Sequence, residues 1–185
     1  CYEFYNMIST ITNYSIALLC VLNINLGFDV NKLVQKRMQK EITKIFSCKD
    51  FELQDVTSTP GFQFKNSTYL VQHQIFEIKK EGALLGYAFL GTAPSKTDTF
   101  EYLILFDENF IQKKAKILVY REDYGGEISS NRWLSQFENT SLTERFFYGE
   151  NISAISGATI SVKSMTQSIN YVYSQLQLQN AVAVR

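Results

Sequence analysis

The chain has 185 residues, with 18 Lys plus Arg, 18 Asp plus Glu and one histidine, so its formal net charge at pH 7 is zero. Neither sign of charge is concentrated in a long block, which excludes the basic footprint of a nucleic-acid-binding protein. Because 45% of the residues are hydrophobic, the composition is that of a globular protein with one domain and a terminal segment.

Residues 1–28 form the first distinct segment, and they contain a short apolar stretch, IALLCVL, of signal-peptide length. Asn23 and Asn25 interrupt what would otherwise be a membrane-spanning helix. Basic residues between positions 32 and 44 favour a cytoplasmic body if the segment stays in the membrane, but they also fit the solvent face of a following helix. We predict a signal peptide or membrane anchor at 1–28 and a single domain at 29–185.

The next element is an amphipathic helix. Starting from Asp29 as the N-cap, apolar residues recur four apart at Val34, Met38 and Ile42, and the helix is expected to end near Ser47. A Pro-Gly pair at 60–61 then predicts a loop.

The middle of the chain is predicted to be β structure. Residues 67–80 and 83–93 form one antiparallel hairpin, and residues 99–108 and 110–122 form a second. In the last strand Lys114 and Lys116 alternate with Ala115 and Ile117, which indicates a sheet with one solvent-exposed face. His73 stands in a strand-like run and is predicted to lie on a sheet face.

The last third of the chain is predicted to be helical. A Gly-Gly turn in EDYGGEISSNRWLSQF leads into a short helix at 131–137, and a final helix follows at 161–178. The fold class is therefore α+β, an antiparallel β meander flanked by an N-terminal helix, a short helix and a C-terminal helix.

Metal binding and acid–base catalysis have little support in the residue pattern. Cys1, Cys20 and Cys48 follow no metal-ligand spacing, so no metal site is predicted. His73 is the only imidazole, and no catalytic residue is assigned.

The segment SGATIS, residues 156–161, combines small residues and hydroxyls just before the final helix. Gly157 and Ala158 allow close approach to the backbone, and Ser156, Thr159 and Ser161 carry hydroxyls. The first amides of a helix lack partners and carry partial positive charge, so the segment can hold a phosphate. It also fits a simpler interpretation, in which Ser161 is an N-cap and Gly157 a loop residue.

AISGATIS resembles the flavinylation motif of the FMN-binding domain family, roughly D-x-x-[ST]-G-A-[TS]. This family includes the C subunit of the sodium-translocating NADH:quinone reductase and the G subunit of the Rnf complex. The resemblance implies that Thr159 carries FMN through a phosphodiester bond, and that Ser156, Gly157, Ala158 and Ser161 belong to its binding site.

Two further segments agree with this resemblance, which covers roughly residues 30–178. The sequence KKEGALLGYAF resembles the turn and hairpin of the family, and YREDYGGEISSNRW resembles its glycine-bearing loop. The resemblance implies flavin contacts from Glu122, Tyr124, Gly125 and Gly126.

Three aromatic residues are candidates for stacking on the flavin, but each also fits an ordinary core or surface role. They are Tyr124, Trp133 and Tyr148.

The implied function is an extracytoplasmic FMN-binding electron-transfer protein, a redox carrier rather than a self-contained enzyme. A separate flavin transferase would attach the FMN, and the redox partners would be membrane-bound or soluble proteins. Ser153 replaces the Asp of the motif. Non-covalent FMN binding and a flavin-free partner-binding domain are therefore alternatives, and a flavin reductase is a third without direct support.

Overall fold

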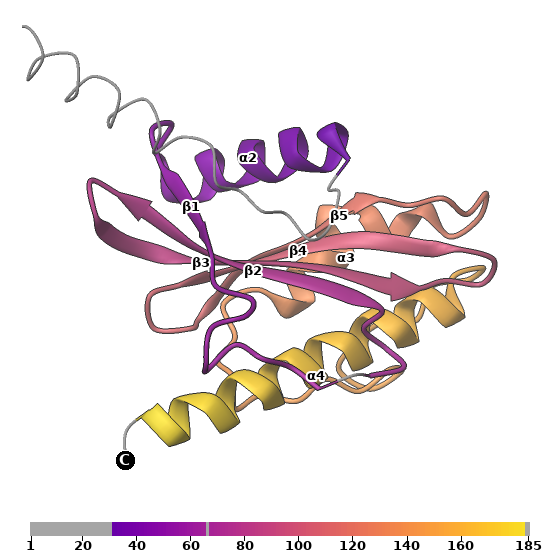
Figure 1. The fold of residues 1–185 in the computed structure, drawn as a ribbon. Coiled ribbons are helices and arrows are strands. Elements are labelled where there is room, and N and C mark those ends of the chain that lie inside the picture. Colours follow the sequence, from indigo (N-terminus) through magenta and orange to yellow (C-terminus); the bar gives the residue numbers. More distant parts are fainter. Residues whose placement is uncertain (1–30, 66, 184–185) are drawn as a thin grey trace, which may run out of the picture. The chain divides into compact units, whose positions relative to one another are not determined.

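The computed structural model describes residues 31–65 and 67–183 (Figure 1). The predicted signal peptide or anchor at 1–28 and the expected cap Asp29 lie outside these residues. The elements in chain order are α2 (Lys32–Phe46), β1 (Glu52–Asp55), β2 (Gln72–Lys80), β3 (Ala83–Pro94), β4 (Thr99–Asp107), β5 (Gln112–Val119), η1 (Gly126–Ser129), α3 (Asn131–Leu134), η2 (Ser135–Phe137) and α4 (Thr159–Ala183). The predicted α+β class is confirmed.

The strands form one five-stranded antiparallel sheet in the order β1-β2-β3-β4-β5. Both predicted hairpins, β2–β3 and β4–β5, are present, and β3 pairs with β4 to join them into a meander. The edge strand β1 was not predicted, because its four residues, ELQD, show no alternation of apolar and polar side chains.

Helix α2 begins with Asn31 as its N-cap, whose side chain accepts a hydrogen bond of 3.0 Å from the Leu33 amide. The N-cap is therefore Asn31 and not the expected Asp29. An Asn side chain can accept a hydrogen bond from an unpaired amide at a helix start as well as Asp does. The predicted stripe is buried at Val34, Met38 and Ile42.

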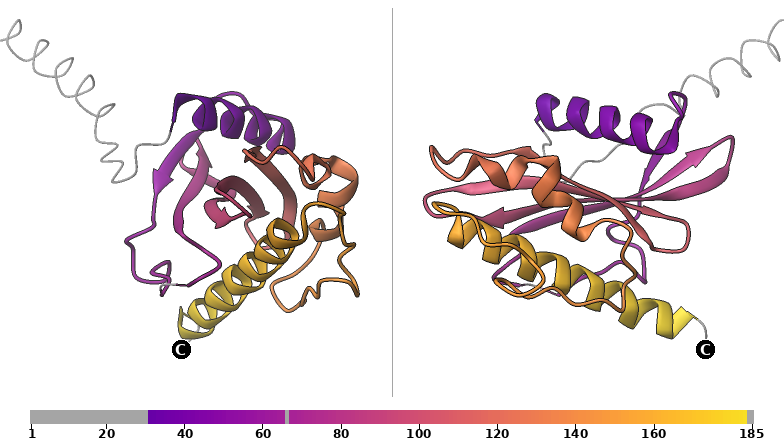
Figure 2. Two further views of the ribbon diagram at one scale, coloured as in Figure 1. Left: turned by 90° about the vertical axis from the view of Figure 1, so that its right-hand side faces the viewer. Right: turned by 180° about the vertical axis from the view of Figure 1, so that it is seen from behind.

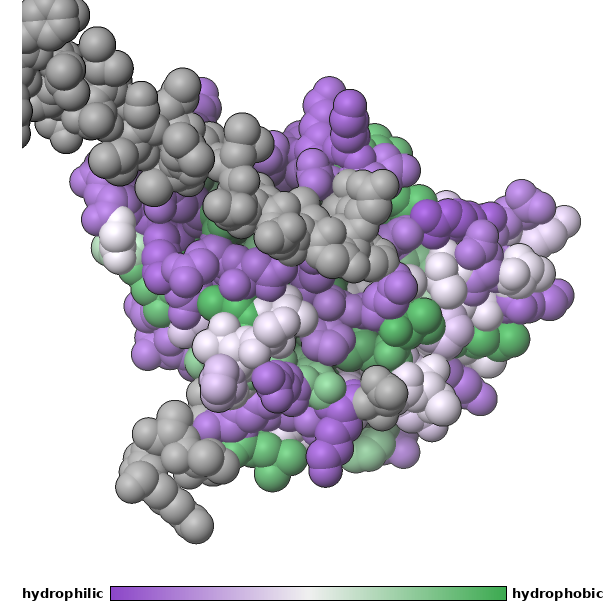
Figure 3. Space-filling model, viewed as in Figure 1, coloured by the Kyte–Doolittle hydropathy of each residue, from purple (hydrophilic) through white to green (hydrophobic). Residues whose placement is uncertain are grey.

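The two long helices cover opposite faces of the sheet, α2 on one and α4 on the other (Figures 1 and 2). On β4, Tyr102 and Ile104 belong to the core cluster that includes α4, whereas Leu103 and Leu105 point to the other face and are equally buried. The outer surface of α2 is largely hydrophilic (Figure 3).

The prediction of a solvent-exposed sheet face is therefore wrong. Leu118 in β5 is 2% exposed, and Arg37 of α2 donates a hydrogen bond to its carbonyl oxygen. Lys114, which we expected to face water, forms an ion pair of 2.6 Å with Glu138. Lysine stems can cover apolar surface while the ammonium finds a partner, so alternation with lysine does not require a wet face.

Helix α4 is anchored to the sheet by buried hydroxyl groups. The Tyr102 hydroxyl lies 2.5 Å from the Ser168 hydroxyl. The Tyr173 hydroxyl lies 2.9 Å from Gln112 Oε1 and 2.7 Å from Thr140 Oγ1. These contacts fix the helix, and with it the position of its N-terminal turn.

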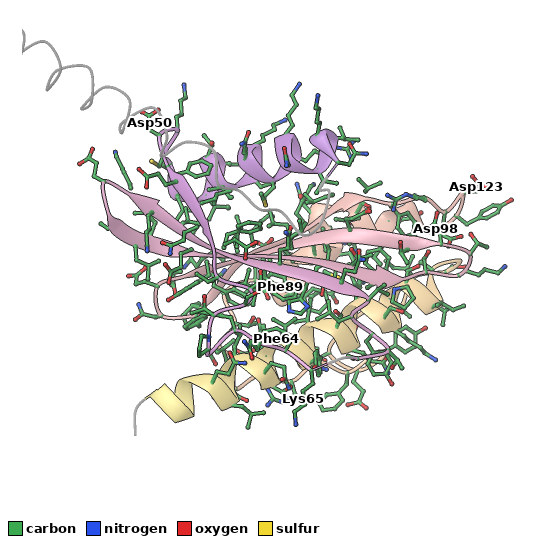
Figure 4. The ribbon with its side chains drawn as sticks, in the orientation of Figure 1. Asp50, Phe64, Lys65, Phe89, Asp98 and Asp123 are labelled. Carbon is green, nitrogen blue, oxygen red and sulfur yellow. The ribbon has the colours of Figure 1, made fainter. Side chains whose placement is uncertain are left out.

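At the other end of α4, the segment before β2 packs across the sheet. Phe64 stacks on His73 with ring centroids 5.0 Å apart and on Phe89 at 5.9 Å (Figure 4). His73 lies in β2 as predicted, and burial lowers its pKa below the usual value. Its role is therefore packing in this aromatic cluster.

No helix within residues 31–65 and 67–183 has both the length and the apolar character needed to cross a membrane.

Candidate functional site

The SGATIS segment forms a turn that leads directly into α4. Gly157 has φ of 78°, a left-handed conformation that glycine adopts without strain. The Ala158 amide donates to the Ile155 carbonyl at 3.2 Å, and the Val162 amide donates to the Ala158 carbonyl at 2.9 Å. The helix starts at Thr159, two residues earlier than predicted, and the side chain of Thr159 is exposed.

The Gly-Gly loop rests on this turn. A Cβ atom added to Gly125 would lie 2.3 Å from the Ala158 Cβ and 2.9 Å from its Cα, so only glycine fits. Gly125 also has φ of 73°. From the other side, a Cβ on Gly157 would lie 3.5 Å from the Tyr124 Cβ and 3.7 Å from the Gly125 nitrogen. The two segments that the resemblance associates are thus in direct contact.

Ser161 is not an N-cap. It lies within the first turn of α4, is 2% exposed, and its hydroxyl is 3.0 Å from the hydroxyl of Tyr120, the residue that follows β5. This contact ties the helix start to the sheet. The prediction of Ser161 as the N-cap is therefore wrong, whereas Gly157 lies in the turn before the helix, as the same interpretation expected.

The first amides of α4 are available to a ligand. In the described part of the chain, no hydrogen bond occupies the amides of Thr159, Ile160 or Ser161. The first turn also has no acidic residue. Unpaired amides and the helix dipole give this end of the helix partial positive charge, which favours an anion.

Glu122 holds the Gly-Gly loop to the turn between β3 and β4. Its two carboxylate oxygens accept hydrogen bonds from the Thr97 amide at 2.7 Å and the Thr97 hydroxyl at 2.9 Å. The Ser95 hydroxyl, and then the Thr97 amide, lower the pKa of Glu122 to about 2. Asp98 lies on the turn between β3 and β4, Asp123 lies on the Gly-Gly loop, and both are found at the same end of the sheet (Figure 4). Glu122 thus fixes the loop through Thr97.

The aromatic candidates occupy different environments. Tyr124 is 77% exposed and lies against Gly157 through its Cβ. Trp133 is 5% exposed, belongs to the core and donates a hydrogen bond of 2.8 Å to the Ser153 carbonyl oxygen. Tyr148 is partly buried against the core. Gly126 is exposed, with no heavy atom within 4 Å of an added Cβ.

Ser153, at the position of the motif Asp, has an exposed side chain and a fixed backbone. Its carbonyl accepts from Trp133, and its amide donates to Gln136 Oε1 at 2.8 Å. A different side chain can therefore stand at this position without repacking of the core.

Lys163 is a residue of this region that the sequence analysis did not single out. Its ammonium lies 5.1 Å from the centroid of the Tyr148 ring. Its position four residues after Thr159 was a signal that could have identified it, but the final helix was predicted to begin only at Ser161, after Thr159.

The exposed Thr159 hydroxyl, the unpaired amides and the clearance at Gly157 fit a phosphate group. A threonine hydroxyl is a poor nucleophile unless a base or metal activates it. Among the described residues, His73 stacks on Phe64, and no group of three His, Cys, Asp or Glu could hold a metal ion.

Comparison with known proteins gives a match in structure but not in sequence. No family model matches the chain, and no curated protein matches it. A crystal structure of NqrC from Shewanella oneidensis matches with a TM-score of 0.52 and 11% sequence identity, covering 77% of this chain and 99% of that chain. The chain has an NqrC-like fold. At this identity the match establishes the arrangement of helices and strands alone.

Proposed function

We propose that this chain is an FMN-binding electron-transfer protein in which the Thr159 hydroxyl carries FMN through a phosphodiester bond. The single observation that carries the proposal is the contact of Gly125 with Ala158. It brings the glycine-bearing loop against the SGAT turn, beside an exposed threonine at the start of a helix. The NqrC-like fold supports the proposal, because the NADH:quinone reductase C subunit belongs to the family that the motif resembles.

Each part of the turn has a distinct role in the proposed site. The amides that open α4 bind the phosphate oxygens, and Gly157 leaves room for the phosphate beside the backbone. Ala158 supports the loop through its contact with Gly125. Ser161 holds the helix start to the sheet through the Tyr120 hydroxyl.

The attachment step is a phosphoryl transfer catalysed by a separate flavin transferase with FAD as donor. The Thr159 oxygen forms a bond to the phosphorus on the flavin side of the pyrophosphate. The bond between that phosphorus and the bridging oxygen breaks, and AMP leaves. The hydroxyl proton passes to a base of the transferase, because a threonine hydroxyl is a poor nucleophile unless a base or metal activates it.

When bound, FMN supplies the redox chemistry, and the protein contributes position and surroundings. Tyr124 and Gly126 are exposed, so a flavin lying over the Gly-Gly loop is accessible to other proteins. We propose membrane-bound or soluble redox partners and a location outside the cytoplasm, where a covalent bond prevents loss of the flavin.

Two alternatives follow from Ser153. Without the acid of the motif, the chain could bind FMN non-covalently or serve as a flavin-free partner-binding domain. Production with a flavin transferase in an exporting host distinguishes them. We expect a yellow protein with flavin absorbance that survives denaturation. Colour lost on denaturation favours non-covalent binding, and a colourless protein favours the flavin-free domain.

The substitution Ser153→Asp tests whether this position limits attachment. The side chain is exposed, so the fold should tolerate the change. We expect a larger flavinylated fraction in Ser153→Asp than in the unsubstituted chain, measured by absorbance per chain after denaturation. Equal fractions would show that the acid at this position is not needed.

A further inference from the structure

Lys163 lies one helical turn after Thr159 on the same face of α4. Residues four apart in a helix are neighbours on its surface. Long side chains in a helix generally lean toward its N-terminus, and Thr159 lies in that direction from Lys163. Both side chains are exposed.

Tyr148 restrains the ammonium of Lys163. The distance between Nζ and the ring centroid is 5.1 Å, within the range of a cation–π contact. The ring is partly buried against the core, and the Tyr148 backbone is fixed by pairing with Ile152. The Gly149 amide also donates to the Ile152 carbonyl at 2.9 Å. The Tyr148 ring that contacts Lys163 therefore has a fixed position in the fold.

The charge of Lys163 has no anionic partner in the described part of the chain. None of the ion pairs there involves Lys163. The first turn of α4 has no acidic residue, although a helix start ordinarily favours one. The first two turns of α4 thus carry a cation, unpaired amides and the positive end of the helix dipole. This arrangement suits an anion supplied from outside the chain.

We propose that Lys163, held on the Tyr148 ring, binds the phosphate of the flavin attached at Thr159. This inference rests on the proposed function. Lys163 is a positioning residue: its ammonium offsets the negative charge of the phosphodiester and holds it against the amides that open α4. The flavin then extends from Thr159 in one direction instead of rotating freely about the threonine side chain.

Acetylation of lysines with N-hydroxysuccinimide acetate, followed by peptide mass spectrometry, tests this directly. Only the neutral amine reacts, and an ion pair keeps it protonated. We expect Lys163 to react about 1.5- to fivefold more slowly in flavin-loaded protein than in unloaded protein, the range for an exposed ion pair. Lys36, exposed on the opposite helix α2, is the matched control and should react equally in both.

The outcomes separate this inference from the proposed function. The mass of each sample shows before labelling whether flavin is attached, and a chain that takes up no flavin overturns both proposals. A chain that carries flavin, yet whose Lys163 reacts as fast as in unloaded protein, overturns the role of Lys163 alone.

Phosphorus NMR of the loaded protein distinguishes contact with the phosphate from shielding by the flavin ring. We expect the phosphodiester resonance to move in Lys163→Met, to stay in place in Lys36→Met, and to return toward its original position in Lys163→Arg. Protection from acetylation together with an unchanged resonance in Lys163→Met would mean that the ring covers the lysine. That result would contradict phosphate binding.

Discussion

The contact between Gly125 and Ala158 makes a specific prediction about substitution by alanine. In Gly125→Ala the new Cβ would lie 2.3 Å from the Ala158 Cβ, so the Gly-Gly loop or the SGAT turn must move. The φ of 73° adds the cost of a left-handed alanine, about 1–2 kcal/mol. Overpacking costs a further ~1–3 kcal/mol. The expected loss of unfolding free energy is about 2–5 kcal/mol.

Two other glycines separate these contributions. Gly149 has φ of 80° but no heavy atom within 4 Å of an added Cβ, so Gly149→Ala should cost only the left-handed conformation. Gly126 has neither feature, and Gly126→Ala should change stability by less than about 0.5 kcal/mol.

Chemical denaturation of the three unloaded variants provides the measurement. The predicted order of stability is Gly126→Ala, then Gly149→Ala, then Gly125→Ala, and thermal midpoints should differ by about 2–4 °C per kcal/mol. We also expect Gly125→Ala to have the lowest flavinylated fraction. If Gly125→Ala is as stable as Gly149→Ala, the loop does not rest on the SGAT turn as described.

Two further predictions concern the contacts that hold the site in place. The pKa of Glu122 is lowered from 4.5 to about 2 in the folded state, so its stabilising contribution is complete above pH 4.5 and disappears as the pH falls toward 2. The stability difference between wild type and Glu122→Gln, measured by denaturation, should therefore shrink as the pH falls over this range. A constant difference would contradict the contact with Thr97. The substitution Glu150→Gln, at an exposed position, is the control. Tyr173→Phe removes a buried hydroxyl that has two partners and should lower the free energy of unfolding by about 1–3 kcal/mol. Tyr69→Phe, at a side chain that is 40% exposed, should lower it little. Equal losses in the two variants would contradict the anchoring role of Tyr173.

The long elements were predictable because their side-chain periods are strong. The buried residues Val162, Met165 and Ile169 of α4 follow the helical spacing in the sequence. The strand β1 was not predictable, because its residues have no alternating pattern of apolar and polar side chains. It forms a strand by pairing with β2. The packing of α2 against the second face of the sheet was also not predicted. Leu118 is buried by α2, a contact that the pattern of β5 alone does not reveal.

The site was predictable only in part, for a similar reason. The resemblance associated the Gly-Gly loop with the SGAT turn, and the structure brings Gly125 and Ala158 into contact. Local sequence could not show that the Glu122 carboxylate is held by Thr97, because this depends on the turn between β3 and β4 lying beside the loop. The position of Lys163 on Tyr148 likewise depends on how the chain folds back before α4.

The mass of the denatured chain tests the central claim most directly. Wild type and Thr159→Val are produced with a flavin transferase, denatured, weighed intact and then mapped by peptide. Valine keeps the shape of threonine but lacks its hydroxyl, and position 159 is exposed, so the fold should be unchanged. We predict a mass increase of one FMN minus one water on the Thr159 peptide of the wild type, and none on Thr159→Val. An unmodified wild type, or an adduct that persists in Thr159→Val, would contradict the account.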